Sequence, residues 1–254
     1  MFGLRNKNGS CWINAALQGV FRIPELQKRF ADGKEDEKNA VEVCLGEVYS
    51  SKGEEGLRSF YECVKTSTMP AGEGIGDSNE LLEFLCDKVP FLDKLMRFKV
   101  AHHIQCNHCE YKDIRNDSII EFDIAPSRPK MAVTEAIAEA VKPFTVEGWK
   151  CEKCSKYGCT KQLLISSFPD VLNIHLTTPD TSVTYPSQVS LNGITYALLS
   201  IVCYRPGHWY TFGRDMPPGQ PWYSFDDTTV RSYDPKHFPL VDTMRLLMYY
   251  RIKE

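Results

Sequence analysis

The chain has 254 residues, of which 43% are hydrophobic and 25% are charged, and it carries 30 basic against 33 acidic side chains. A chain of this length and composition can bury a sizeable core, which excludes a disordered protein, a collagen-like protein and a small domain held together by disulfides. The net charge of −3 argues against a protein that binds nucleic acid by neutralising phosphates, so no nucleic-acid partner is expected.

The N-terminal residues lack the apolar core of a signal peptide, and no stretch of the sequence approaches the roughly 18 apolar residues of a membrane span. We therefore expect no membrane partner and a location in the cytoplasm, the nucleus or both. We also expect a monomeric protein. Because these compartments are reducing, the ten cysteines should be thiols, metal ligands or a nucleophile.

Helical patterns fill the first part of the chain. Apolar residues recur at helical spacing in four segments, with a break at Pro24 in the first: Trp12–Phe30, Asn39–Tyr49, Gly56–Val64 and Asn79–Lys88. Turns such as Thr68–Asp77 separate them, and the charged segment 33–38 is interpreted as a solvated loop. After Pro90 the pattern becomes that of strands.

Alternating and β-branched runs predict strands in the second part of the chain, over Ser118–Ile124, Gln162–Ser167, Val171–Leu176, Tyr196–Tyr204, Trp209–Phe212 and Arg245–Ile252. One helix, Val133–Val141, interrupts them, with Thr134 in position to cap it. The sequence therefore predicts an α+β protein in which a helical part precedes a part that is mostly sheet.

Two Cys-x-x-Cys pairs flank segment 110–150: Cys106 with Cys109 before it, and Cys151 with Cys154 after it. Each pair can present two thiolates to one ion, and four thiolates suit a tetrahedral zinc. The sequence therefore predicts one structural zinc ion, with the nearby His108 and Cys159 as bystanders. The alternative is a pair of turns that have lost their metal. Four protein ligands would leave no open coordination position for catalysis.

Three residues that are far apart in the sequence have the chemistry of a thiol hydrolase. Cys11 follows a polar turn and starts a predicted helix, where the helix dipole favours a thiolate. His208 begins one predicted strand and Asp226 ends the next, so the carboxylate can orient the imidazole while its other ring nitrogen takes the thiol proton. Taken singly, each residue is also compatible with a packing role in the core.

The segment from Gly3 to Gln18, GLRNKNGSCWINAALQ, resembles the cysteine box of the ubiquitin-specific proteases, whose usual form is GLxNxGNTCYxNSxLQ. Further segments are similar to other motifs of that family and stand in the same order: DSNELL at 77–82, FPDVLNIHL at 168–176, the histidine box at 196–210 and 222–230, and the final strand at 245–251. Both cysteine pairs fall where the family carries its zinc. The resemblance thus covers essentially the whole chain.

The resemblance implies a single catalytic domain over residues 1–254 with the fold of a papain-like cysteine protease hand. Residues from about 1 to 90 would form a helical thumb, 91–180 the zinc-bearing β fingers, and 181–254 an antiparallel β palm. It also implies a hydrolase that cleaves the isopeptide bond after the C-terminal Gly-Gly of ubiquitin. One structural Zn²⁺ and no organic cofactor are expected.

The resemblance also assigns roles to four residues. Cys11 is implied to be the nucleophile, His208 the base that later protonates the leaving lysine amine, and Asp226 the carboxylate that orients the base. Asn6 is implied to donate its side-chain amide to the tetrahedral oxyanion, together with the backbone N–H of Cys11.

The substrate is implied by two acidic residues. Asp77 and Glu80 match positions that hold the basic C-terminal tail of ubiquitin, although acids at the start of a helix are also typical of helix stabilisation. Trp12 stands where the family usually has tyrosine. A SUMO-directed relative of the family also has tryptophan at this place. A ubiquitin-like modifier such as SUMO is therefore the alternative substrate.

The sequence departs from the family pattern in the turn before the nucleophile. Residues 8–10 read Asn-Gly-Ser instead of Gly-Asn-Thr, so the glycine that a tight turn needs has moved by one place. The chain is also short for the family, which indicates a compact relative or the catalytic core of a longer protein. Two other function classes stay open: a catalytically silent ubiquitin-binding module and a zinc-ribbon interaction domain. Reactivity of Cys11 separates the enzyme from both.

Overall fold

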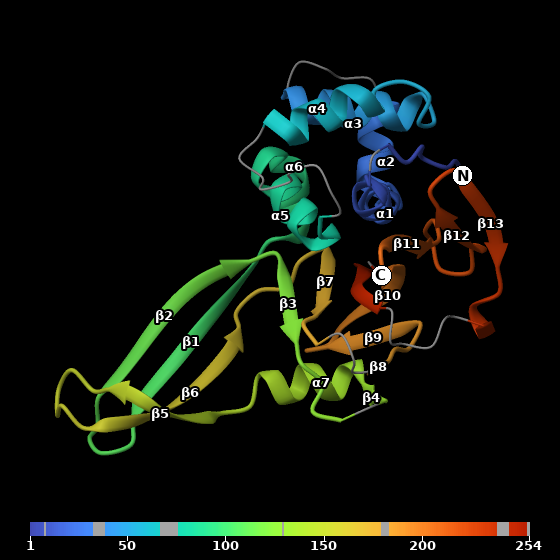
Figure 1. Ribbon diagram of the computed structural model, residues 1–254. Helices are drawn as coiled ribbons and strands as arrows, with labels where there is room; N and C mark the ends of the chain where they lie inside the picture. Colours follow the sequence, from blue (N-terminus) through green and yellow to red (C-terminus); the bar gives the residue numbers. More distant parts are fainter. Residues whose placement is uncertain are drawn as a thin grey trace.

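In the computed structural model, the described residues are 1–7, 9–32, 39–66, 76–128, 130–178, 183–237 and 244–252, except for the side chains of residues 65 and 66. The predicted loop at 33–38 and most of the predicted turn at 68–77 lie outside them. The N-terminal helices, coloured blue to green, gather at one end of the molecule, next to a large sheet, and a narrower sheet projects away (Figure 1). Among the described residues, no helix combines the length and the hydropathy that crossing a membrane requires.

Six helices form the first part of the chain: α1 (Cys11–Val20), α2 (Pro24–Ala31), α3 (Ala40–Ser50), α4 (Leu57–Thr66), α5 (Ser78–Lys88) and α6 (Pro90–Met96). The predicted helical segments are confirmed, and the break at Pro24 separates α1 from α2. Helix α6 corrects the prediction that strands begin directly after Pro90. Pro90 is instead the first residue of this helix, where its missing N–H costs no hydrogen bond and its fixed φ suits the helix.

The projecting sheet has four antiparallel strands in the order β2 (Lys112–Ile119), β1 (Phe98–Cys106), β6 (Tyr157–Ile165) and β5 (Phe144–Lys150). The sequence patterns do not predict β1, β5 or most of β2. Strand β2 is exposed along nearly its whole length, and the middle of β1 carries His102 and His103. Strand β2 therefore lacks the apolar alternation that identifies a strand. Strand β1 does bury Phe98, Val100, Ile104 and Cys106 on one face, but His102 interrupts that apolar run.

The larger sheet has the strand order β13, β12, β11, β10, β14, β7 and β3, with β9 beside β10. The strands are β3 (Glu121–Ile124), β7 (Val171–Leu176), β9 (Gln188–Leu191), β10 (Ile194–Arg205), β11 (His208–Gly213), β12 (Trp222–Asp226), β13 (Thr229–Tyr233) and β14 (Met244–Arg251). All neighbours are antiparallel except β3 and β7. Because β3 and β7 belong here, the segment 91–180 that was assigned to the fingers supplies strands to both sheets.

Helix α7 (Val133–Ala140) covers one end of the larger sheet, after a short strand β4 (Met131–Ala132) that pairs with β8 (Val183–Thr184). Its buried residues join the core formed by the sheet. The predicted cap at Thr134 is wrong, because the helix begins at Val133 and its N-cap is Ala132, two positions before Thr134. The backbone N–H of Ala132 donates instead to the carboxylate of Glu135 at 3.2 Å.

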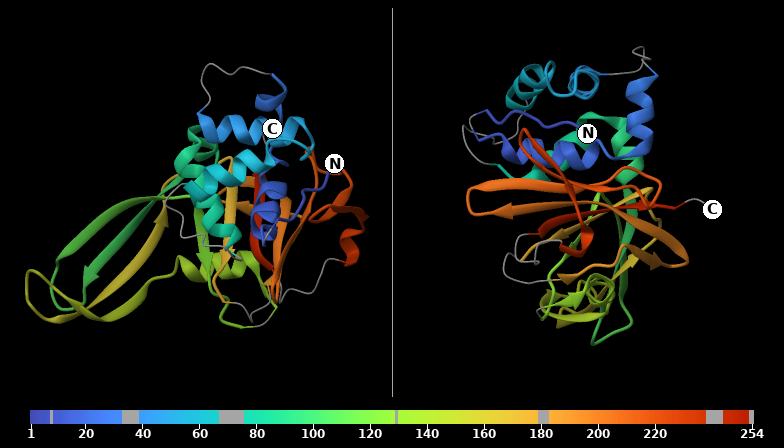
Figure 2. Two further views of the ribbon diagram at one scale, coloured as in Figure 1. Left: turned by 45° about the horizontal axis from the view of Figure 1, so that its top comes forward. Right: turned by 90° about the vertical axis from the view of Figure 1, so that its right-hand side faces the viewer.

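Helix α1 lies at the centre of the fold, and all ten of its residues are buried. It packs against α5 on one side and against β10, β11 and β12 on the other. In the right-hand view of Figure 2 the blue and cyan helices lie on one side of the orange and red strands. A helix that is enclosed on all sides is fixed relative to its neighbours, so α1 can present its first residue to the sheet at a defined place.

Candidate active site

Cys11 is the first residue of α1 and is almost completely buried, with 2% of its surface exposed. The turn that leads into it is closed by the backbone N–H of Ser10, which donates to Asn6 Oδ1 at 3.0 Å. Gly9 adopts φ +84° in this turn, a conformation that glycine reaches without steric cost. The displaced glycine therefore still supplies the left-handed residue, while its neighbour Asn8 lies outside the described residues.

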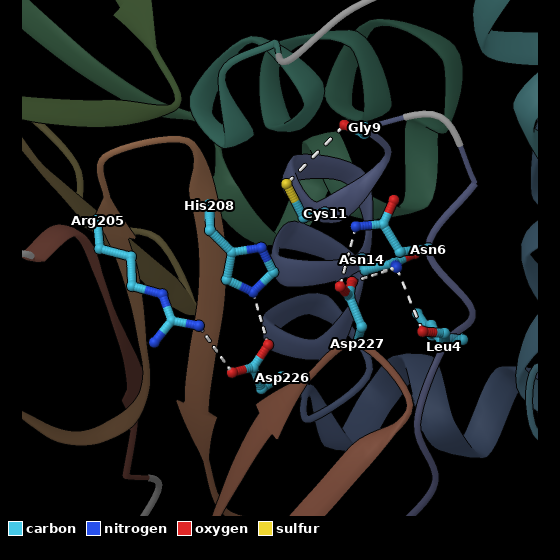
Figure 3. Close-up of polar contacts among 9 residues, drawn as sticks. All are labelled: Leu4, Asn6, Gly9, Cys11, Asn14, Arg205, His208, Asp226 and Asp227. Carbon is cyan, nitrogen blue, oxygen red and sulfur yellow. Dashed lines mark hydrogen bonds and ion pairs between the residues drawn. The ribbon is translucent and has the colours of Figure 1, made fainter.

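His208 and Asp226 form a hydrogen-bonded pair beside the cysteine. His208 Nε2 lies 2.6 Å from Asp226 Oδ1, and the ring presents its other nitrogen, Nδ1, toward Cys11 (Figure 3). His208 begins β11 and Asp226 ends β12, which are antiparallel neighbours in the larger sheet. The sheet therefore brings together a carboxylate, an imidazole and a thiol in the order that a thiol hydrolase requires.

Arg205 is a further charged neighbour of this pair. It lies directly opposite His208 in the β10–β11 ladder, and its guanidinium donates to Asp226 Oδ2 at 3.2 Å. Asp226 thus uses one oxygen for the imidazole and the other for the guanidinium. Sequence reasoning did not identify Arg205, because its contact depends on the strand register and on the tight turn at Gly207, which has φ +78°.

The residue after Asp226 serves the other side of the site. Asp227 Oδ2 accepts a hydrogen bond from Asn6 Nδ2 at 2.9 Å, and its Oδ1 accepts one from Asn14 Nδ2 at 2.8 Å. Asp227 adopts φ +51°, a left-handed conformation that aspartate tolerates better than most residues. Sequence reasoning did not assign a role to Asp227 or Asn14, although Asp227 stands next to the predicted triad carboxylate.

Asn6 lies on the opposite side of Cys11 from His208 (Figure 3). Its amide nitrogen carries two hydrogens, and Asp227 accepts one of them. Among the described residues, the second hydrogen has no protein acceptor, which leaves it for an oxygen of a bound substrate. A nucleophile with a base on one side and an amide donor on the other is the arrangement that acyl transfer needs.

The two predicted substrate residues stand at the start of α5. Asp77 is the N-cap of this helix, where its carboxylate accepts from the backbone N–H of Asn79 at 2.8 Å, and Glu80 is exposed one turn further. Ser78 Oγ donates to the backbone oxygen of Trp12 at 2.8 Å, which ties this end of α5 to α1. Asp77 therefore has a structural use as a cap, and binding of a substrate by either acid stays a prediction.

Cys106, Cys109, Cys151 and Cys154 converge at the turns β1–β2 and β5–β6, with their sulfur atoms within 4.8 Å of one another. The Sγ atoms of Cys106 and Cys154 are 3.7 Å apart, as are those of Cys109 and Cys151. Four sulfurs that each bind zinc at about 2.3 Å in a tetrahedron lie about 3.8 Å from one another. The four side chains therefore fit a zinc ion, which would join the two turns of the projecting sheet.

His108 and Cys159 are not part of this cluster as the described residues define it. The ring of His108 contacts the backbone oxygen of Tyr157, with Nε2 at 2.8 Å. Cys159 lies opposite Cys106 in the β1–β6 ladder. The prediction that both residues are bystanders agrees with these positions.

Comparison with known proteins agrees with the geometry of the site. The family model described as ubiquitin carboxyl-terminal hydrolase matches residues 2–249. The chain is 24% identical over 221 residues to ubiquitin carboxyl-terminal hydrolase 47 of Drosophila melanogaster, covering 75% of this chain and 14% of that protein. It is 22% identical over 287 residues to ubiquitin C-terminal hydrolase 13 of Arabidopsis thaliana, covering 92% of this chain and 25% of that protein. The chain therefore spans a quarter or less of these relatives.

Solved structures share the fold. The SAGA DUB module of Ubp8, Sgf11, Sus1 and Sgf73 bound to monoubiquitin contains a chain that matches with a TM-score of 0.82 at 17% identity, covering 100% of this chain and 69% of that one. The same module bound to ubiquitin aldehyde matches with a TM-score of 0.82 at 16% identity, covering 100% and 70%. The predicted fold is confirmed: a helical thumb, projecting fingers with a cysteine cluster that fits a zinc ion, and a palm sheet.

Proposed function

Because the chain belongs to the ubiquitin carboxyl-terminal hydrolase family, we propose that it is a thiol-dependent hydrolase that cleaves the isopeptide bond after the C-terminal Gly-Gly of ubiquitin. The observation that carries this proposal is the placement of Cys11 between the His208–Asp226 pair and the amide of Asn6. Each of these side chains has the chemical type that its role requires. A binding module without catalysis would need none of them in this arrangement.

The first half of the reaction transfers the ubiquitin acyl group to the enzyme. Cys11 Sγ attacks the carbonyl carbon of the terminal glycine while His208 Nδ1 takes the thiol proton, and Asp226 stabilises the imidazolium that forms. The carbonyl oxygen becomes an oxyanion between Asn6 Nδ2 and the Cys11 backbone N–H. The C–N bond then breaks, the lysine amine leaves with the proton from His208, and a thioester remains on Cys11.

The second half of the reaction regenerates the enzyme. A water molecule gives a proton to His208 and attacks the thioester carbonyl, and the same two donors hold the second oxyanion. The C–S bond breaks, the Cys11 thiolate recovers its proton from His208, and ubiquitin leaves as a carboxylic acid that loses its remaining proton to solvent. A zinc ion held by Cys106, Cys109, Cys151 and Cys154 would take no part in these steps, because four protein ligands would leave it no open coordination position.

The proposal is tested with ubiquitin that carries an electrophile at its C-terminal glycine, alongside SUMO and NEDD8 probes of the same design. We expect a covalent adduct of ubiquitin with the wild-type protein and none with Cys11→Ala. An adduct with SUMO or NEDD8 instead would keep the mechanism and change the substrate. A folded, zinc-loaded protein that reacts with no probe would refute the proposed activity and favour the silent binding module.

We also propose that the protein works as a monomer in the cytoplasm, the nucleus or both. The cluster of four cysteines that fits a metal ion supports a reducing compartment, because cysteines at such spacings are metal ligands there and not disulfides. Light scattering coupled to gel filtration measures the first claim, and fractionation of cells that express the chain measures the second.

A further inference from the structure

Tyr61 connects the thumb to the loop that precedes the nucleophile. It lies on α4 with 7% of its surface exposed. Its hydroxyl oxygen accepts a hydrogen bond from Ser10 Oγ at 2.9 Å. As a donor, the hydroxyl faces two acceptors, Asn14 Oδ1 at 2.8 Å and the backbone oxygen of Arg5 at 3.1 Å. One phenol oxygen therefore contacts three residues around Cys11, in the preceding loop and in α1, although α4 itself supplies no residue to the proposed chemistry.

The contact with Asn14 determines which way that amide faces. With Oδ1 held by the Tyr61 hydroxyl, Asn14 directs Nδ2 toward Asp227 Oδ1 at 2.8 Å. The reversed amide would place an oxygen against the carboxylate, which is repulsive. The other oxygen of Asp227 accepts from Asn6 Nδ2. Tyr61 thus acts on the oxyanion donor through a chain of hydrogen bonds that leads from Asn14 to Asp227 and then to Asn6.

The contact with Ser10 acts on the same donor from its other end. Ser10 Oγ accepts from the backbone N–H of Lys7 at 2.9 Å, and the backbone N–H of Ser10 donates to Asn6 Oδ1 at 3.0 Å. Both atoms of the Asn6 amide are therefore held by groups that lead back to the Tyr61 hydroxyl. Burial raises the pKa of Tyr61 to about 12, so the hydroxyl keeps its proton over the working range of an enzyme.

We propose that Tyr61 is a positioning residue for the proposed hydrolysis, which orients the Asn6 amide toward the oxyanion through Asn14, Asp227 and Ser10. This inference rests on the proposed function. Tyr61 touches neither the substrate nor the reacting atoms, so its removal should affect the stabilisation of the tetrahedral intermediate. It should not affect the binding of ubiquitin or the reactivity of the thiol.

The test compares Tyr61→Phe with Tyr196→Phe in steady-state hydrolysis of a ubiquitin C-terminal amide that releases a fluorophore. Tyr196 is a matched control, because its buried hydroxyl donates to the backbone oxygen of Pro169 at 2.8 Å, in the larger sheet and away from the site. We expect Tyr61→Phe to lower kcat about tenfold, as for the loss of one hydrogen bond in the transition state. Its KM and its rate of Cys11 alkylation should match those of the wild type, and Tyr196→Phe should retain kcat.

A double-mutant cycle identifies the route of the effect. If Tyr61 acts through Asn6, Tyr61→Phe should have no further effect on kcat in the Asn6→Ala background, because the donor it positions is already absent. Equal kcat values for Tyr61→Phe and Tyr196→Phe, or additive effects in the cycle, would overturn the inference. A wild-type protein that does not hydrolyse the substrate would refute the proposed function instead, so the two failures are distinct.

Discussion

The side-chain amide of Asn6 donates to Asp227 Oδ2 at 2.9 Å, although 221 positions in the sequence separate the two residues. The preceding residue, Asp226, bonds His208 at 2.6 Å. Two consecutive carboxylates therefore serve opposite sides of Cys11, one the base and the other the oxyanion donor. The left-handed conformation of Asp227 directs the two side chains to these different partners.

Replacing Asp227 by Ala should lower kcat/KM by about 10²-fold, because an oxyanion donor that loses its orientation behaves like one that is removed. The measurement is hydrolysis of a fluorogenic ubiquitin amide, together with the rate at which iodoacetamide modifies Cys11, read by mass spectrometry of its peptide. Cys11 in Asp227→Ala should be alkylated at the wild-type rate.

Asp226→Asn provides the contrast. It should lower both hydrolysis and alkylation, because the imidazole loses the carboxylate that orients it toward the thiol. If Asp227→Ala slows the alkylation of Cys11 as strongly as Asp226→Asn does, the assignment of Asp226 to the base and of Asp227 to the oxyanion donor is wrong.

The predicted role of Asp77 in binding the tail of ubiquitin can be separated from its role as a helix cap. Asparagine caps a helix as well as aspartate does, so Asp77→Asn should preserve the melting temperature and remove only the negative charge. If the carboxylate holds the basic tail of ubiquitin, KM should rise several-fold while kcat stays constant. Asp77→Ala should in addition lower the free energy of unfolding by about 1 kcal/mol. An unchanged KM for Asp77→Asn would leave this residue with the capping role alone.

The wild-type protein should contain about one zinc ion per chain by elemental analysis. Cys154→Ser should abolish zinc binding and lower the melting temperature sharply, because the metal contributes its binding free energy to folding. Cys159→Ser is the matched control, since Cys159 faces Cys106 across the ladder but lies outside the cysteine cluster. Its zinc content should equal that of the wild type. A folded wild-type protein with substoichiometric zinc after growth in zinc would contradict the assignment.

Glu121 should make stability depend on pH. Burial raises the pKa of its carboxyl above the usual value, while Glu121 Oε1 accepts from Asn79 Nδ2 at 2.9 Å. An acid with a raised pKa in the folded state holds more protons there than in the unfolded state, so stability falls as the pH rises past the ordinary pKa of glutamate. Glu121→Gln keeps an acceptor for Asn79 and avoids the charge. It should melt a few degrees higher at pH 8, with a difference that shrinks toward pH 5.

The control for this prediction is Glu139→Gln, the same chemical change at an exposed position of α7 and away from the acidic groups that act on Glu121. It should have a melting temperature close to that of the wild type at both pH values. A melting temperature of Glu121→Gln below that of the wild type at pH 8 would show that the charged carboxylate is stabilised by its surroundings, contrary to the direction of its pKa.

Sequence alone was sufficient where the signal is local. The two Cys-x-x-Cys turns identify all four members of the metal cluster, because each turn sets the spacing of its own two sulfurs. The start of α1 at Cys11 follows from a polar turn and the apolar spacing after it. The pairing of His208 with Asp226 follows from two short strands joined by one loop. The family resemblance added Asn6.

Tertiary structure alone decided the contacts that support these residues. Strand β2 is exposed along nearly its whole length, so no buried face marks it in the sequence. The roles of Asp227 and Arg205 depend on one left-handed backbone conformation and on strand register. The position of Tyr61 depends on how α4 packs over the loop before Cys11. A pattern of residue types records which side chains a segment offers, whereas the orientation of an amide or a hydroxyl is fixed by partners from elsewhere in the chain.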